Sequence, residues 1–146
     1  MLAKSGTYAL VLESKEEKDI KFGRKGLLKS KIAYYIYIGS AFGPGGIKAR
    51  VSRHFRPKKP HWHIDYLTQN IDLQEAWLSY NENRLEHIWA NKLLNNTNYN
   101  PIKAFGCSDC RCYSHLFYIK SPSFKDFQNI TQQNLHKFNQ QDTEQL

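Results

Sequence analysis

Residues 33–55, AYYIYIGSAFGPGGIKARVSRHF, pass from a strand pattern to a helical pattern across a glycine-rich break. Aromatic and β-branched residues fill the first part, as is typical of strands. Tyr35, Tyr37 and Gly39 share one face of this strand, because successive strand side chains point to opposite sides. The GPGG segment at residues 43–46 interrupts the pattern, since glycine and proline break regular structure. This stretch therefore predicts a strand that ends in a tight turn before a helix.

The predicted helix runs to about Phe55. Its apolar residues Ile47, Val51 and Phe55 lie four residues apart and form one stripe along the helix. Arg50 and His54 consequently lie together on another face.

An earlier strand pattern, GTYALVLE at residues 6–13, places Tyr8, Leu10 and Leu12 on one face. We therefore expect Tyr8 and Tyr37 to share a pocket. The charged segment between the two strands, residues 14–31, is interrupted by glycines and predicts a long hairpin excursion.

The rest of the chain is predicted to alternate between strands and helices. We expect a strand at 61–67 with His61, His63 and Asp65 on one side, and a second strand at 72–80. A helix is expected over 83–94, with a core-facing stripe of Leu85, Ile88, Trp89 and Leu93. A last strand is expected at 115–119.

The predicted fold is a small α/β domain over residues 1–120, with a mainly antiparallel central sheet flanked by helices. Residues 121–146 are predicted to form a loose helical tail that frays.

The composition indicates an anionic partner. The chain has 146 residues, with 21 lysines and arginines against 13 acidic residues and a net charge of +8. This balance favours nucleic acid or a membrane surface. No amphipathic basic helix, apolar spanning run or signal-peptide core is evident, so we expect a cytoplasmic protein that does not bind membranes.

Basic and aromatic residues alternate in RHFRPKKPHWH, residues 53–63, which is typical of a surface that binds nucleic acid. Cationic side chains take phosphates, and aromatic rings stack on bases. The candidate contacts are Arg53, Arg56, Lys58, Lys59, Trp62 and His63.

Four features in order resemble the GIY-YIG nuclease superfamily: Gly6-Thr7-Tyr8, Tyr37-Ile38-Gly39, Arg50 with His54, and Glu86 on a later helix. Thr7 stands where the family usually has isoleucine. The stretches HWHIDYL, LEHIWA and FGCSDCRCYSHLFY are similar to an uncharacterised branch that is found alone or fused to endonuclease III-type glycosylases. The resemblance covers residues 5–119 and implies a metal-dependent endonuclease that acts on DNA in repair.

The resemblance also assigns roles to individual residues. It implies that Glu86 holds one Mg²⁺ or Mn²⁺ ion, that Arg50 braces the phosphate, that Tyr8 helps to deprotonate the attacking water, and that Tyr37 orients water and phosphate. His54 is expected to hydrogen-bond either Tyr8 or a phosphate. For the late asparagine of the family, the candidates are Asn100, Ser108 and Asp109.

All three cysteines lie in one short segment, Cys107-x-x-Cys110-x-Cys112-x-x-His115. The four side chains have spacings that zinc sites use. Only one such cluster is present, whereas the strong form of the signal has two. We therefore favour a reduced cysteine-rich turn over a zinc site.

Each of these residues also has an ordinary structural interpretation, because strand tyrosines are usually packed aromatics and helical arginines are usually solvated. Two alternatives to the nuclease hypothesis follow. The first is a non-catalytic module that binds DNA or RNA on the same scaffold, and the second is a zinc-stabilised interaction domain. A DNA-repair protein is the expected macromolecular partner.

Overall fold

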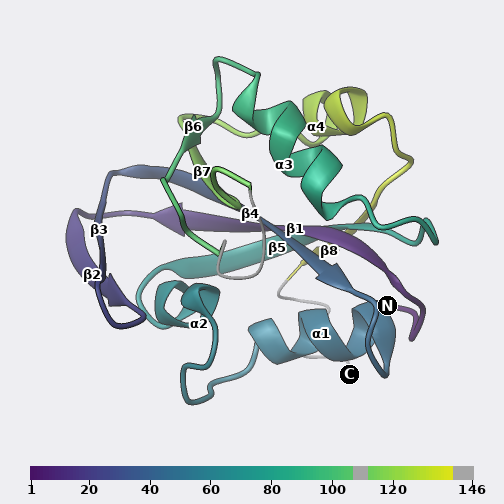
Figure 1. Cartoon of the computed structure of the whole chain (residues 1–146), viewed down its shortest axis with the longest axis horizontal. Helices are drawn as coiled ribbons and strands as arrows, with labels where there is room; N and C mark the ends of the chain where they lie inside the picture. Colours follow the sequence, from purple (N-terminus) through teal and green to yellow (C-terminus); the bar gives the residue numbers. More distant parts are fainter. Residues whose placement is uncertain (107–111, 140–146) are drawn as a thin grey trace.

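The computed structural model describes residues 1–106 and 112–139 of the chain (Figure 1). Its elements, in chain order, are β1 (Gly6–Ser14), β2 (Lys18–Phe22), β3 (Gly26–Ser30), β4 (Ala33–Ala41), α1 (Gly46–His54), α2 (His63–Thr68), β5 (Asp72–Ser79), α3 (Glu86–Leu94), β6 (Asn100–Pro101), β7 (Leu116–Ile119), α4 (Phe124–Thr131) and β8 (His136–Asn139).

Within the described residues, six strands form one sheet in the order β6-β7-β4-β1-β5-β8, and every pair in it is antiparallel. Helices α1 and α2 lie on one face of this sheet and helices α3 and α4 on the other (Figure 1). The β2–β3 hairpin packs its apolar side into the core on the α1–α2 face. This arrangement confirms the predicted α/β class with a central antiparallel sheet.

No helix in the described part of the chain has the length and apolarity needed to cross a bilayer.

The register of the two central strands explains the glycine at position 39. Tyr8 of β1 lies directly opposite Gly39 of β4, and Leu10 lies opposite Tyr37. A β-carbon at Gly39 would come within 2.5 Å of the Tyr8 hydroxyl oxygen, which no real contact allows. Glycine at this position therefore gives the Tyr8 ring its space, and the predicted common face of Tyr8 and Tyr37 is confirmed.

The segment predicted as a strand at 61–67 is helical instead, because α2 occupies residues 63–68. The carboxylate of Asp65 accepts hydrogen bonds from the backbone N–H groups of His61 at 2.8 Å and Trp62 at 2.9 Å. These bonds satisfy donors that an isolated helix leaves without partners at its first turn. Asp65 thus caps the start of α2, and the prediction that His61, His63 and Asp65 share one strand face is wrong.

Helix α3 begins three residues later than predicted, at Glu86. Leu85, Trp89 and Leu93 are buried as expected, but Ile88 is 51% exposed. The helix therefore buries a narrower stripe than the spacing of its apolar residues indicates.

The C-terminal part adds a strand that the sequence does not predict. Helix α4 begins as expected after Ser123, whose hydroxyl accepts from the Asp126 N–H at 3.2 Å. Strand β8 then pairs with β5, placing Phe138 opposite Ala76. A four-residue strand with one apolar residue leaves little pattern to detect, so this segment was expected to fray. Residues 140–146 lie outside the described part.

Candidate functional site

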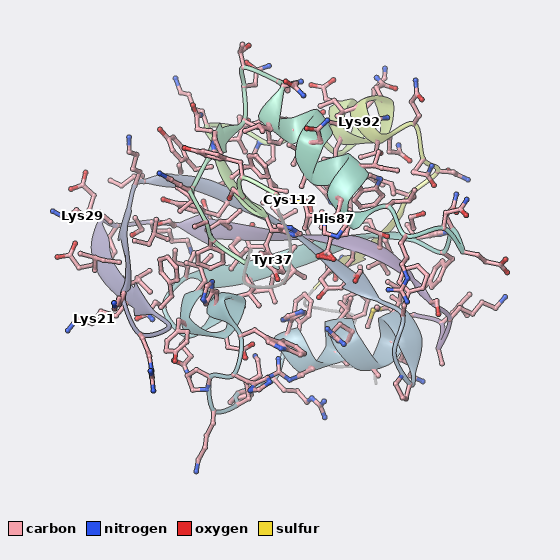
Figure 2. All side chains as sticks on the ribbon, viewed as in Figure 1. Lys21, Lys29, Tyr37, His87, Lys92 and Cys112 are labelled. Atoms are coloured by element: carbon pink, nitrogen blue, oxygen red, sulfur yellow. The ribbon has the colours of Figure 1, made fainter. Side chains whose placement is uncertain are left out.

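A cavity of about 510 Å³ lies where β1 and β4 meet the starts of α2 and α3. It is lined by Tyr8, Tyr37, Gly39, Ser40, Arg50, His61, Trp62, His63, Arg84, Glu86, His87, Gly106 and His115. Four of the five predicted catalytic residues thus converge on one space. Figure 2 shows Tyr37, His87 and Cys112 in the middle of the molecule, whereas Lys21 and Lys29 lie at its periphery.

Tyr8 and His54 form a buried pair beneath this cavity. The Tyr8 hydroxyl lies 2.7 Å from His54 Nε2, which is one of the two partners predicted for His54. Burial lowers the pKa of His54 to about 3, and the nearby Lys58 charge acts in the same direction. His54 is therefore neutral near pH 7, and either member of the pair can donate, depending on the imidazole tautomer.

Tyr8 is held in its phenol form. Burial raises the pKa of Tyr8 well above its ordinary value, and the charges of Tyr37 and Glu86 raise it further, while Arg50 and Arg53 lower it. Tyr8 is therefore a neutral phenol near pH 7, and positive charge added near it would lower this pKa.

Arg50 and Arg53 flank the Trp62 ring but have different partners. Their guanidinium carbons lie 4.5 Å and 4.1 Å from the ring centroid. Arg53 also makes a two-point ion pair with the fully buried Asp65, at 2.9 and 3.0 Å. Burial raises the pKa of Asp65, but the Arg53 hydrogen bonds and the backbone N–H groups outweigh it and lower the pKa to about 2. Arg53 thus braces α1 against α2, while Arg50 lines the cavity.

Glu86 is the first residue of α3, where a carboxylate interacts favourably with the helix dipole. The start of the helix is tied to β1, because the Leu85 N–H donates to the buried Thr7 hydroxyl at 3.3 Å. An apolar residue at position 7 would offer no such acceptor. Thr7 therefore helps to set where Glu86 enters the cavity.

The environment of Glu86 keeps it ionised. Its Oε1 lies 3.1 Å from Nδ1 of His115. Burial raises the pKa of Glu86, but hydrogen bonds from His115 and Ser40 and the charges of His115 and His87 outweigh it, so the pKa lies below its ordinary value. Among the described residues that line the cavity, Glu86 is the single carboxylate. One carboxylate, completed by phosphate oxygens and waters, suits Mg²⁺ or Mn²⁺.

The remaining predicted residues lie elsewhere. Arg56 and Lys58 line a neighbouring cavity of about 410 Å³, and the Lys58 ammonium donates to the carbonyls of His54 and Arg56. Lys59 is exposed. Asn100 lies on β6 and donates to the Tyr118 carbonyl at 3.2 Å, and it is not among the residues that line the 510 Å³ cavity. The candidates Cys107, Ser108, Asp109 and Cys110 fall outside the described residues.

Among the cavity residues, the side chains of Ser40, Arg84 and His87 were not predicted as part of the site. Arg84 and His87 flank Glu86 in the sequence, so their proximity to a candidate metal ligand at a helix start was a usable signal. Ser40 follows Gly39 at the end of β4, where the strand alternation no longer tells which side chains reach a pocket.

Comparison with known proteins gives one family. The family described as a domain of unknown function, DUF123, matches residues 7–139, which include every strand of the central sheet except the first residue of β1. No curated protein and no solved structure matches the chain.

Proposed function

The chain belongs to the DUF123 family, and from the geometry of its cavity we propose that it is a divalent-metal-dependent endonuclease of the GIY-YIG type that hydrolyses phosphodiester bonds in DNA. The observation that carries this proposal is the convergence of Tyr8, Tyr37, Arg50 and Glu86 on one cavity. These positions are separated by up to 78 residues in the chain, and the resemblance in the sequence assigns a role to each. Two further parts of the proposal rest on that resemblance alone. They are that the protein acts in DNA repair and that its partner is a repair protein.

The charges around the cavity suit a phosphodiester. Arg50 and Arg84 both line it, with His61 and His63 beside them. A guanidinium presents paired donors that match two phosphate oxygens. Arg50 is already oriented by the Trp62 ring, so little side-chain entropy is lost when it binds a phosphate.

The proposed chemistry divides the work among three groups. A Mg²⁺ or Mn²⁺ ion at Glu86 would supply positive charge where negative charge develops on the phosphate. Arg50 binds the phosphate, and Tyr8 accepts a proton from the attacking water in the phenolate form that Arg50 and a cation at Glu86 would favour. Neutral His54 donates to that phenolate when its ring proton is on Nε2.

The high pKa of Tyr8 favours a second candidate function. A buried phenol with a raised pKa is a poor base, so the same cavity could bind nucleic acid without cleaving it. In that case Arg50, Arg84 and Trp62 would contact phosphate and base. Glu86 would only hold the segment before β7 in place, through its contact with His115.

The test compares wild-type protein with Glu86→Gln on labelled flap, bubble, abasic and duplex DNA and on matching RNA, with Mg²⁺ or Mn²⁺. We expect cleavage to fall by orders of magnitude in Glu86→Gln while DNA binding survives, because the substitution keeps size but removes the charge. Glu82→Gln is the matched control, since Glu82 is an exposed acid on the same segment. Equal cleavage by Glu86→Gln at limiting Mg²⁺ would contradict the site, and binding without any cleavage by the wild type would favour the second candidate.

A further inference from the structure

Three side chains that commonly ligate metals meet beside the cavity. His87 comes from the first turn of α3, while Cys112 and His115 come from the segment that leads into β7. One ligand atom from each lies within 4.8 Å of the others. His87 Nδ1 is 2.9 Å from Cys112 Sγ, and the rings of His87 and His115 are perpendicular with centroids 5.7 Å apart. Figure 2 shows His87 and Cys112 next to each other.

We propose that His87, Cys112 and His115 bind a zinc ion. Two imidazoles and a thiolate are the donors that zinc prefers, whereas Mg²⁺ prefers oxygen ligands. This site is therefore chemically distinct from the proposed Mg²⁺ ligand Glu86, although the two are adjacent. Binding converts the Cys112 thiol to a thiolate and releases its proton to solvent.

The surroundings of His115 fit a metal ligand. Its Nδ1 faces both the Glu86 carboxylate at 3.1 Å and the Ile38 carbonyl at 3.3 Å. Histidines that ligate zinc usually donate their other ring N–H to a carboxylate or a backbone carbonyl. In this arrangement Nε2 binds the ion and Nδ1–H holds Glu86 in place.

The zinc ion would connect two parts of the fold that the backbone does not join directly. It links the first turn of α3 to the segment before β7, and through His115 it fixes the orientation of Glu86. His87 and His115 both line the cavity, so the fourth position of a tetrahedral site is open to water from that side.

The test measures zinc binding by the whole reduced chain in the absence of DNA. The protein is stripped with a chelator and titrated with zinc against a chromophoric competitor, and a second sample is titrated with Co²⁺ to look for a thiolate charge-transfer band. We expect one tight zinc ion per chain in the wild type. His87→Ala and Cys112→Ser should each weaken binding by more than about a hundredfold, and Cys112→Ser should also lose the cobalt charge-transfer band.

His136→Ala is the matched control, because His136 is also exposed but lies on β8, away from the cluster. It should bind zinc as the wild type does. Circular dichroism in chelator checks that His87→Ala is folded. Equal zinc affinity in His87→Ala and wild type, or no zinc uptake by the wild type, would overturn the proposal.

This inference does not rest on the nuclease proposal, and Glu86→Gln separates the two. That variant should lose cleavage, but its zinc affinity should fall by at most about a hundredfold, because Glu86 is a neighbour of the ligand His115 and not a ligand itself. Absence of cleavage in the wild type would leave the zinc result standing.

Discussion

The two walls of the cavity are built in opposite ways. In the α1–α2 wall, Tyr8 and Trp62 line the cavity, and His54, Arg53 and Asp65 lie behind them. This wall satisfies its polar groups mainly within the chain, through the Tyr8–His54 hydrogen bond and the Arg53–Asp65 ion pair. In the α3–β7 wall, Glu86, His87 and His115 line the cavity, with Cys112 beside His87, and they present a carboxylate and nitrogen and sulfur donors of the kinds that bind metals.

This difference separates stability from binding. On the α1–α2 wall, removing one member of a buried pair should lower the free energy of unfolding, because a buried polar group without a hydrogen bond is costly. On the α3–β7 wall, His87 is exposed and the Glu86 side chain keeps 22% of its exposure, so changes there should alter ligand binding more than folding. The following variants test this contrast.

Asp65→Ala should have the largest effect on folding. It removes an acceptor that serves the Arg53 guanidinium and two backbone N–H groups. We expect the free energy of unfolding to fall by about 3–5 kcal/mol, or roughly 10 °C in melting temperature. Thermal unfolding followed by circular dichroism measures this. Asp72→Ala is the control, because Asp72 pairs with Lys15 on the open surface, and an equal loss in both variants would contradict the contrast.

His54 should make the fold sensitive to mild acid. Its pKa is about 3 in the folded state and near 6.5 when unfolded. Between those values the unfolded chain binds more protons, so stability is full above about pH 6.5 and falls by up to about 1.4 kcal/mol per pH unit as the pH drops toward 3. His54 Nδ1 has no hydrogen-bond partner among the described residues that would stabilise the charged ring.

Urea unfolding at several pH values between about 7 and 4 checks this, with His54→Gln for comparison. Glutamine is neutral and can still hydrogen-bond Tyr8, so the variant should lose much less stability over that range. The Asp65 contribution should remain in both proteins, since its pKa of about 2 means that its stabilisation is lost only as the pH falls from 3.8 toward 2. Parallel pH profiles of the two proteins would argue against a neutral buried His54.

Tyr8→Phe should have an intermediate effect. The substitution removes the hydroxyl but keeps the ring against Gly39, and it leaves His54 Nε2 without its partner. We expect a loss of about 1–2 kcal/mol in unfolding free energy. Under the nuclease proposal it also slows cleavage without changing metal affinity. Tyr34→Phe serves as the control, because the Tyr34 hydroxyl donates to Glu13 outside the cavity. A changed Mg²⁺ dependence in Tyr8→Phe would contradict a role in proton transfer.

His87→Ala in metal-free buffer should have the smallest effect, less than about 0.5 kcal/mol, because His87 is exposed. When zinc is added, the wild type should gain stability by mass action and the variant should gain less. Melting temperatures with chelator and with zinc measure both quantities. A large loss in chelator would show that the α3–β7 wall also supports the fold.

Local patterns in the sequence were enough to predict the elements that build the frame. The alternation in β1 and β4 places Tyr8 and Tyr37 on one face, and the break at 43–46 followed by the stripe of Ile47 and Val51 gives α1. These features depend on neighbours within a few residues, so they are visible without the fold. The resemblance to a nuclease family added Glu86 as a candidate that periodicity alone did not distinguish from a solvated helical acid.

Local sequence patterns could not predict which residues that are far apart in the chain come into contact. In residues 61–67, alternation favours a strand, but Arg53 and the N–H groups of His61 and Trp62 hold Asp65 in a helical cap. Strand β8 forms because β5 offers it an edge, and not because of its own apolar content.

By itself, the sequence determined a basic α/β chain with two tyrosine strands and an arginine helix, since those properties come from composition and short-range spacing. Only the tertiary structure decided that Tyr8 bonds to His54, that Thr7 anchors the start of α3, and that His87 lies against Cys112. The physical reason is that these contacts join residues 25 to 78 positions apart. Their proximity follows from the register and packing of the whole sheet, which no short stretch of the chain contains.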